Sequence, residues 1–342
     1  MKILLTAINA KYIHSNLAVY SLKAAAGVFG EQVEIGEYTI NQKTEQILKD
    51  IYRRQPDVVA FSCYIWNRRM VEELIRELPK VLPGVRLWAG GPEVTYDARA
   101  FLEACPKAAG VMRGEGEETF CRLAAYYIEG ECLLSGIRGL TYRGEDGRIH
   151  ETEEREPADM DRLPFACENP ERFTNRIVYY ESSRGCPFRC SYCLSSVERQ
   201  VRFRSMELVE KELLFFLKAQ VPQVKFVDRT FNLDPGRTAR LWQWLLEHDN
   251  GITNFHFEIG ADLLTEEELA IMSRMRPGLI QLEIGVQSTN GDTIRGIDRT
   301  MDLERLKAAV RRIKGFHNIH QHLDLIAGLP FEDLKSFRRS FD

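Results

Sequence analysis

The chain has 342 residues, of which 44% are hydrophobic and 28% charged, and its formal net charge is −4. This length suits two domains that each bury a core, and the mildly acidic balance excludes general nucleic-acid binding as the main role. No apolar run approaches the roughly 20 residues that cross a bilayer, and the N-terminus lacks a signal-peptide cleavage pattern, so we expect a cytoplasmic protein without a membrane partner.

Residues 1–130 alternate short apolar runs with amphipathic stretches, which predicts strands followed by helices. The expected strands span 2–8, 32–40, 57–65, 85–91 and 109–114. The expected helices span 16–30, 43–55, 68–82, 98–105 and 115–130. Five strand–helix repeats at this spacing predict an α/β domain with a doubly wound parallel sheet of the flavodoxin-like type. In such sheets, ligands bind beyond the carboxyl ends of the strands.

Residues 131–176 differ in character, and we expect them to form a linker on the surface. A hairpin is predicted over 136–157, with its turn at Glu145–Gly147. The stretch that follows, 158–173, is polar and contains prolines.

The alternation of strands and helices resumes over residues 177–342. The expected strands span 177–185, 223–228, 254–261, 278–288 and 320–330. The expected helices span 205–220, 234–249, 265–276 and 301–316. Five such units predict an open or closed (β/α) barrel of the TIM type, with catalytic groups at the carboxyl ends of the strands. The chain ends inside a further expected helix, so we expect either a partial barrel or a natural protein that is longer.

Three of the eight cysteines, Cys186, Cys190 and Cys193, lie within eight positions directly after the first strand of this second domain. Nearby arginines would favour the thiolate form, which is the form that binds metals. A cubane iron–sulfur cluster normally takes four thiolates. A set of three therefore indicates a cluster with one iron left open, much as a catalytic metal site keeps an open position.

Three other interpretations of the cysteine loop remain, and in one of them the clustering of the cysteines is a coincidence. A zinc ion could use these three cysteines and one distant ligand, or Cys190 and Cys193 could form a redox dithiol. The remaining cysteines are scattered, and we expect them to be buried fillers or ordinary surface thiols: Cys63, Cys105, Cys121, Cys132 and Cys167.

The segment "GCPFRCSYC" resembles the motif of the radical S-adenosylmethionine (radical SAM) superfamily, in which an aromatic residue precedes the last cysteine. The segments "QVKFVDRTFNLDPGR", "FHFEIGADLL", "LIQLEIGVQSTN" and "LDLIAGLPFED" resemble successive strand ends of the barrel of that superfamily. They are most similar to the subgroup with an N-terminal cobalamin-binding domain. The resemblance covers roughly the whole chain.

The resemblance implies a 4Fe-4S cluster on Cys186, Cys190 and Cys193, with S-adenosylmethionine on the open iron. An electron from the reduced cluster then cleaves the sulfonium to give a 5′-deoxyadenosyl radical. By position, Tyr192 would pack near the adenine and Asp228 would hold the methionine amino group. The other residues that the resemblance places around S-adenosylmethionine are Glu258, Glu283, Gln287, Gly328 and Pro330, with Asp324 ranked below Glu283.

The expected cobalamin-binding residues lie toward or just after the carboxyl ends of predicted strands of the N-terminal sheet, and they are Asn9, Ser62, Gly90, Gly91, Gly114 and Glu115. Glycines here permit the backbone to approach a large ligand. The D-x-H-x-x-G motif that supplies an axial histidine in one branch of cobalamin proteins is absent from the sequence, so we do not assign His14 as a cobalt ligand.

The leading hypothesis is a cobalamin-dependent radical SAM enzyme that methylates or rearranges an unknown substrate, with an electron donor such as flavodoxin or ferredoxin. The second is a radical SAM enzyme whose N-terminal domain has lost cobalamin and serves as a scaffold, acting on RNA or a peptide. The third is a metal-binding module without chemistry of its own.

Overall fold

The computed structural model describes residues 1–342 except 131–132, 168, 170–172 and 174–175, and Cys132 lies outside the described residues. The chain divides into two compact units, Met1–Arg176 and Ile177–Asp342.

The first unit is built on one seven-stranded sheet of order β2-β1-β3-β4-β5-β6-β7. Its strands β1 to β5 are parallel to one another, as predicted for a doubly wound sheet. The strands of this sheet are β1 (Ile3–Asn9), β2 (Val33–Thr39), β3 (Val58–Ser62), β4 (Arg86–Gly90), β5 (Gly110–Met112), β6 (Leu140–Arg143) and β7 (Ile149–Glu151). Strands β1 and β3 are buried along their whole length, because helices cover both faces of the sheet.

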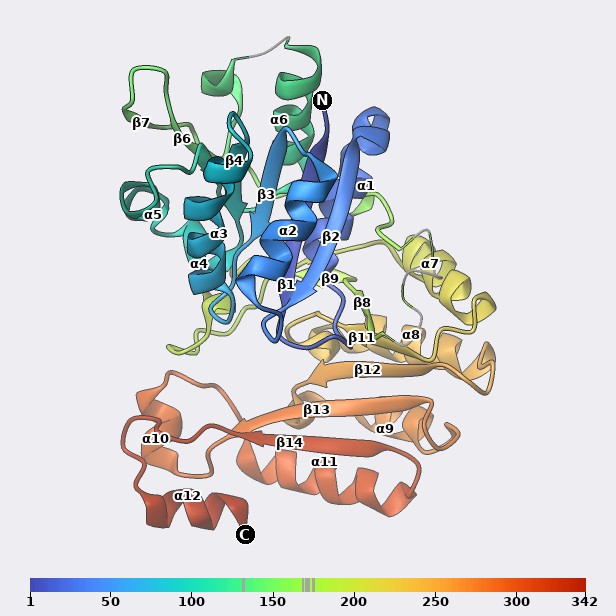
Figure 1. Ribbon diagram of the computed structural model, residues 1–342. Helices are drawn as coiled ribbons and strands as arrows, with labels where there is room; N and C mark the ends of the chain where they lie inside the picture. The colour runs from blue at the N-terminus through green and yellow to red at the C-terminus, as the bar shows by residue number, and fades with distance from the viewer. Residues whose placement is uncertain (131–132, 168, 170–172, 174–175) are drawn as a thin grey trace. The chain divides into compact units, whose positions relative to one another are not determined.

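The helices of this unit are α1 (Leu17–Ala25), α2 (Thr44–Arg54), α3 (Arg68–Val81), α4 (Pro92–Thr95), α5 (Ala98–Ala104) and α6 (Glu117–Glu129). Helices α2 and α3 pack together on one face of the sheet, and α1 packs with α6 on the other (Figure 1). The apolar face of α3 is buried through Val71, Leu74, Ile75 and Leu78, which recur at helical spacing.

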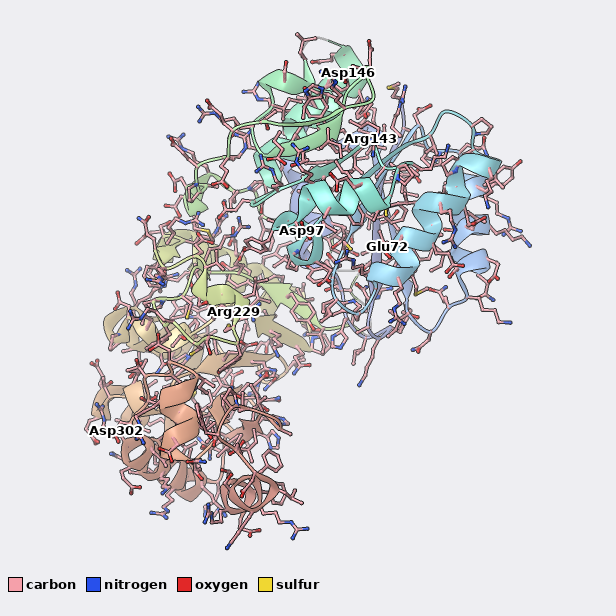
Figure 2. All side chains as sticks on the ribbon, turned by 90° about the vertical axis from the view of Figure 1, so that its left-hand side faces the viewer. Glu72, Asp97, Arg143, Asp146, Arg229 and Asp302 are labelled. Carbon is pink, nitrogen blue, oxygen red and sulfur yellow. The ribbon has the colours of Figure 1, made fainter. Side chains whose placement is uncertain are left out.

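The hairpin of β6 and β7 belongs to this sheet, whereas the sequence placed it in a linker outside the sheet. Strand β6 pairs antiparallel with β5, and β7 pairs antiparallel with β6. Arg143 on β6 donates to the Leu102 carbonyl over 2.7 Å, and Asp146 lies at the hairpin turn (Figure 2). The pairing covers an edge of β5 that would otherwise be unpaired, which is a physical reason for the hairpin to join the sheet.

The second unit is a five-stranded parallel sheet of order β14-β13-β12-β11-β8, so neighbouring strands follow one another along the chain. Its strands are β8 (Val178–Tyr180), β11 (Gln223–Phe226), β12 (Asn254–Ile259), β13 (Ile280–Gln287) and β14 (His320–Leu325), and a small hairpin is formed by β9 (Ser183–Arg184) and β10 (Arg202–Phe203). Its helices are α7 (Met206–Lys218), α8 (Pro235–Glu247), α9 (Glu266–Met272), α10 (Gly291–Gly296), α11 (Leu303–Phe316) and α12 (Leu334–Phe341). This order confirms the predicted partial (β/α) barrel (Figure 1).

Two predicted helix starts are confirmed by their side-chain caps. Asp234, which directly precedes Pro235, accepts a hydrogen bond from the Arg237 amide at the start of α8. Thr265 forms a capping box with Glu268 at the start of α9. Each cap fixes the point where the chain leaves a loop for a helix.

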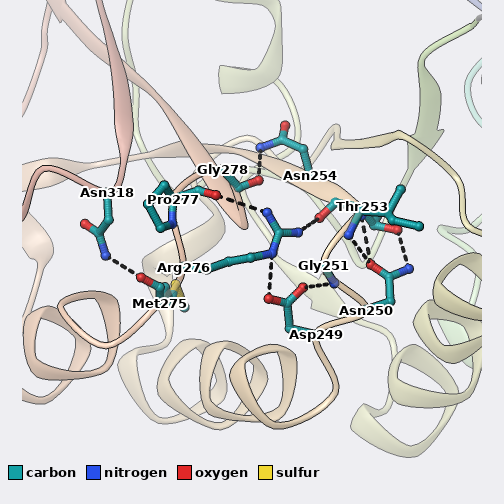
Figure 3. A network of polar contacts seen from close by, with 11 residues as sticks. Asp249, Asn250, Gly251, Thr253, Asn254, Met275, Arg276, Pro277, Gly278 and Asn318 are labelled. Carbon is teal, nitrogen blue, oxygen red and sulfur yellow. Dashed lines mark hydrogen bonds and ion pairs between the residues drawn. The ribbon is translucent and has the colours of Figure 1, made fainter.

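A polar network holds the loops near the amino end of β12 (Figure 3). The Arg276 guanidinium lies 2.6 Å from the Asp249 carboxylate and donates to the carbonyls of Thr253 and Pro277. One side chain therefore joins three loop positions. In barrels of this type the amino end of the strands serves stability, which leaves the opposite end for chemistry.

Candidate functional site

The three spaced cysteines lie in one loop that closes on itself. Cys186 and Cys190 are buried, Cys193 is half-buried, and all three are free thiols. The loop starts after β9 and returns at β10, and the antiparallel pairing of these strands brings its ends together. The Cys186 amide donates to the Glu198 carbonyl over 2.9 Å, and the Cys193 amide donates to the Cys190 carbonyl over 3.0 Å. Backbone hydrogen bonds therefore position the cysteines before any ligand is considered.

Gly185 is the residue that permits this closure. Its φ is +97°, in the left-handed region that side chains disfavour. A Cβ at this position would overlap the carbonyl oxygen of Gln200. Glycine is therefore required directly before the first cysteine, because only a residue without a side chain fits there.

Three thiols on one loop are a donor set that suits an iron–sulfur cluster with one open iron. Across the residues that the structure describes, no three Cys, His, Asp or Glu side chains converge in the way that metal ligands do. The loop supplies three thiol donors, but their side chains do not converge in this structure. The assignment of all three as cluster ligands therefore stays a prediction.

Asp228, just beyond β11, is 1% exposed and has three hydrogen-bond donors around it. Its Oδ1 accepts from the hydroxyls of Ser182 and Ser183, both over 2.6 Å, and its Oδ2 accepts from the Ser182 amide over 3.0 Å. Burial raises the pKa of Asp228, and the serine donors oppose that rise. The carboxylate anchors the segment that leads into the cysteine loop, while its predicted contact with S-adenosylmethionine stays a prediction.

Glu258 and Glu283 lie side by side in register on β12 and β13. Their neighbours along each strand, such as Phe257 and Leu282, are buried, so the two carboxylates share the opposite, polar face of the sheet. The structure thus brings together two of the acidic residues named from the sequence, while their contact with S-adenosylmethionine stays a prediction.

Lys225 and His256 both lie close to Glu283, and neither was predicted from the sequence. The Lys225 Nζ lies 2.6 Å from Glu283 Oε2 and 3.7 Å from Glu258 Oε1. His256 Nε2 lies 3.1 Å from Glu283 Oε2, at ion-pair distance but outside hydrogen-bond geometry. The two-residue alternation of β11 and β12 was the signal that could have placed Lys225 and His256 on this face.

The two carboxyl groups have opposite pKa shifts. His256 and then Lys225 hold the pKa of Glu283 down at about 2. Burial raises the pKa of Glu258, against the opposing charges of Arg229 and Lys225. Paired groups whose surroundings separate their pKa values are typical of functional sites.

Gln287 ends β13 with a φ of +68°, which is unusual for a residue with a side chain. Its Oε1 is buried, and within the described residues no donor reaches it. A strained backbone and an unsatisfied buried oxygen at a strand's carboxyl end are features of ligand-binding positions.

The remaining predicted residues of this unit are more exposed. Gly328 and Pro330 lie in the exposed loop after β14, and Asp324 is exposed opposite Gly285 of β13. The Tyr192 hydroxyl accepts a hydrogen bond from Arg299 over 3.2 Å, which links the cysteine loop to the segment after β13.

In the first unit, the predicted residues lie at or just after the carboxyl ends of β1, β3, β4 and β5. The Asn9 amide donates to the His14 carbonyl and to Glu37, both over 3.0 Å, and the Ser62 hydroxyl accepts from Asn16. These polar groups therefore hold the loops in place.

Gly91 and Glu115 have structural roles of their own. Gly91 has a φ of +110°, and a Cβ there would lie 2.6 Å from the Cys63 carbonyl oxygen. Glu115 accepts a hydrogen bond from the Ala158 amide over 2.8 Å and lines a cavity of about 760 Å³ beside α1 and α6.

Exposed apolar side chains follow the same strand ends, and the sequence analysis did not single them out. They are Tyr12 after β1, Ile65 and Trp66 after β3, and Tyr96 after α4. Trp66 stacks on Tyr64 with ring centroids 4.5 Å apart. Ligands of such sheets bind beyond the carboxyl ends of the strands, so these four residues, which we call the apolar rim, are candidates for contact with a bound ligand.

Comparison with known proteins identifies both units. Residues 3–124 match the B12 binding domain family, and residues 180–342 match the Radical SAM superfamily. The chain is 27% identical over 310 residues to the cobalamin-dependent radical SAM methyltransferase TokK of Streptomyces tokunonensis, covering 83% of this chain and 44% of that protein. It is 26% identical over 313 residues to 2-(S-pantetheinyl)-carbapenam-3-carboxylate methyltransferase of Streptantibioticus cattleyicolor, with 83% and 44% covered. The chain thus spans less than half the length of these curated relatives.

Solved structures share the fold. The cobalamin-dependent S-adenosylmethionine radical enzyme OxsB, with aqua-cobalamin and S-adenosylmethionine bound, superposes with a TM-score of 0.77 at 20% identity, covering 99% of this chain and 51% of that one. The radical S-adenosylmethionine methyltransferase TsrM from Kitasatospora setae gives 0.77 at 17% identity, covering 100% and 70%. Among the described residues, no helix has both the length and the apolar character needed to cross a membrane. The chain belongs to the radical SAM superfamily, in the group that carries a cobalamin-binding domain.

Proposed function

We propose that this chain is the catalytic core of a cobalamin-dependent radical SAM methyltransferase. The observation that carries the proposal is the loop of three free cysteines at the start of a partial barrel, preceded by a B12 binding domain. When bound, the 4Fe-4S cluster and S-adenosylmethionine supply one-electron cleavage of the sulfonium, and cobalamin supplies methyl transfer.

The cysteine loop would hold the cluster through Cys186, Cys190 and Cys193. Asp228 keeps the segment before the loop in place through the two serines, and Gly185 lets the loop close. These contacts fix the backbone of the loop and of the segment before it, which supports the positioning of residues in a functional site.

The polar face of β12 and β13 would hold the charged and hydroxyl groups of S-adenosylmethionine. Glu283 stays ionised because His256 and Lys225 favour its carboxylate, so it can hold an ammonium group or accept from a hydroxyl. Gln287 would use its unsatisfied buried oxygen as a further acceptor.

The exposed apolar rim of the first unit would pack against cobalamin. The names and bound ligands of the related methyltransferase and of OxsB support cobalamin in preference to a scaffold domain that has lost it. We assign no lower ligand to the cobalt. A cytoplasmic electron donor of the flavodoxin or ferredoxin class would supply the reducing electron.

Anaerobic reconstitution with iron and sulfide, followed by titration with hydroxocobalamin, tests this function. We expect about four irons per chain and a saturable change in the visible spectrum of the corrin. The Cys193→Ala variant should lose iron, while Cys121→Ala, which changes a cysteine of α6 in the other unit, should retain it. One zinc and no iron in the wild-type protein would contradict the proposal. A full cluster without corrin binding would favour the scaffold alternative instead.

A further inference from the structure

A turn after α10 contacts the cysteine loop from the side of β13. The Ile297 carbonyl accepts a hydrogen bond from the Ser191 amide over 2.9 Å, and Ile297 itself is buried. Asp298 Oδ2 lies 3.5 Å from Arg189 Nε, but both side chains are exposed and such a pair contributes little. This backbone hydrogen bond therefore fixes the distance between the turn and the loop.

Arg299 adds a charged contact at the same place. Its Nη1 donates to the Tyr192 hydroxyl over 3.2 Å and lies 3.8 Å from Cys190 Sγ. Its Nη2 donates to the carbonyl of Gly285 on β13. One guanidinium thus joins the middle of the cysteine loop to a barrel strand, and the two connections leave from different nitrogens of the same planar group.

The chemistry of arginine suits this arrangement. Guanidinium keeps its positive charge at all relevant pH values and presents its donors in a rigid fork. Lysine carries the same charge on a single nitrogen, so it cannot maintain both connections in one fixed geometry. A fixed positive charge beside a thiolate-bound cluster favours the more reduced, more negative state.

We propose that Arg299 is a positioning residue that holds Cys190 and Tyr192 against β13 and stabilises the reduced state of the cluster. This inference rests on the proposed function, because it assumes that the cysteine loop holds an iron–sulfur cluster. Arg299 acts here through the loop, by the hydrogen bonds and the charge that the structure shows.

The test compares R299Q and R299K with the wild-type protein. Arg295→Gln is the matched control, because Arg295 precedes Arg299 by four residues and its exposed side chain pairs with the exposed Asp292. Three quantities are measured: amide hydrogen exchange over residues 186–193 before reconstitution, the rate at which a chelator removes iron afterwards, and the midpoint potential of the cluster.

In R299Q we expect faster exchange in the loop, iron release accelerated about tenfold, and a lower midpoint potential. In R299K we expect the midpoint potential to stay near that of the wild type, while exchange and iron release are as fast as in R299Q. This variant separates the effect of the positive charge from the effect of the two hydrogen-bonded connections. R295Q should match the wild type in all three. A folded R299Q protein with wild-type exchange, iron release and potential would overturn the inference while the proposed function stands. A wild-type protein that assembles no cluster would overturn both, and the exchange measurement would still show whether Arg299 holds the cysteine loop against β13.

Discussion

Lys225 on β11 reaches across β12 to place its Nζ 2.6 Å from Oε2 of Glu283 on β13. The contact spans two strand spacings, which only a long side chain on the polar face can do. Glu258 on the intervening strand lies 3.7 Å from the same ammonium, so one cation serves two carboxylates. This relationship keeps two negative charges close together on a face that the proposed function assigns to S-adenosylmethionine.

Replacing Lys225 with Met should destabilise the protein by about 1–2 kcal/mol at pH 7, because Glu258 and Glu283 then repel each other without a cation between them. The pair is partly exposed, so solvent screening limits the effect. Urea unfolding measures the free energy, and Lys211→Met, at an exposed position of α7, should change it little.

The same variant should show a distinct dependence on pH. The folded-state pKa of Glu283 is about 2, below its usual 4.5, so its contribution is complete above pH 4.5 and is lost as the pH falls toward 2. The difference between wild type and K225M should therefore shrink across that window. A difference that stays constant from pH 7 to pH 3 would contradict the assigned electrostatics.

Gly185→Ala should destabilise the second unit by about 2–3 kcal/mol, because the new Cβ meets the Gln200 carbonyl in a left-handed backbone. Gly251→Ala is the matched control, since Gly251 has a φ of +72° and open space around it. The control should cost about 1 kcal/mol through backbone strain alone. Equal losses in the two variants would show that the close approach at Gly185 is unimportant.

Tyr96→Ala should weaken binding of hydroxocobalamin about tenfold, because the exposed ring, just after α4, belongs to the apolar rim. Tyr52→Ala removes an exposed tyrosine from α2 and should leave the dissociation constant unchanged. The visible spectrum of the corrin reports both. Equal affinity in the wild type and Y96A would place the corrin elsewhere.

The sequence predicted much of the fold because strand and helix periods are local properties of the chain. The parallel strands of both sheets followed from apolar runs, and the starts at Asp234 and Thr265 followed from capping residues. The addition of β6 to the edge of β5 did not follow, because that pairing depends on contacts far apart in sequence. Helix α10 was also missed, since six residues give too little periodicity to detect.

The candidate site was likewise predictable from the sequence only in part. The cysteine spacing and the acidic residues at strand ends were visible in the sequence, and the structure places Glu258 directly beside Glu283. The partners of these groups were not visible. The serines that surround Asp228 lie 45 and 46 residues away, and Arg299 lies 109 residues from Cys190. Such contacts depend on tertiary packing and not on local pattern.

The central claim is that the cysteine loop carries a cluster that cleaves S-adenosylmethionine. The most direct measurement is the yield of 5′-deoxyadenosine from the anaerobically reconstituted protein after chemical reduction, compared with Cys190→Ala and Cys121→Ala. We predict product from the wild type and from C121A, and none above background from C190A. Cleavage in C190A at the wild-type rate, or none in a wild-type protein that holds about four irons, would contradict the account.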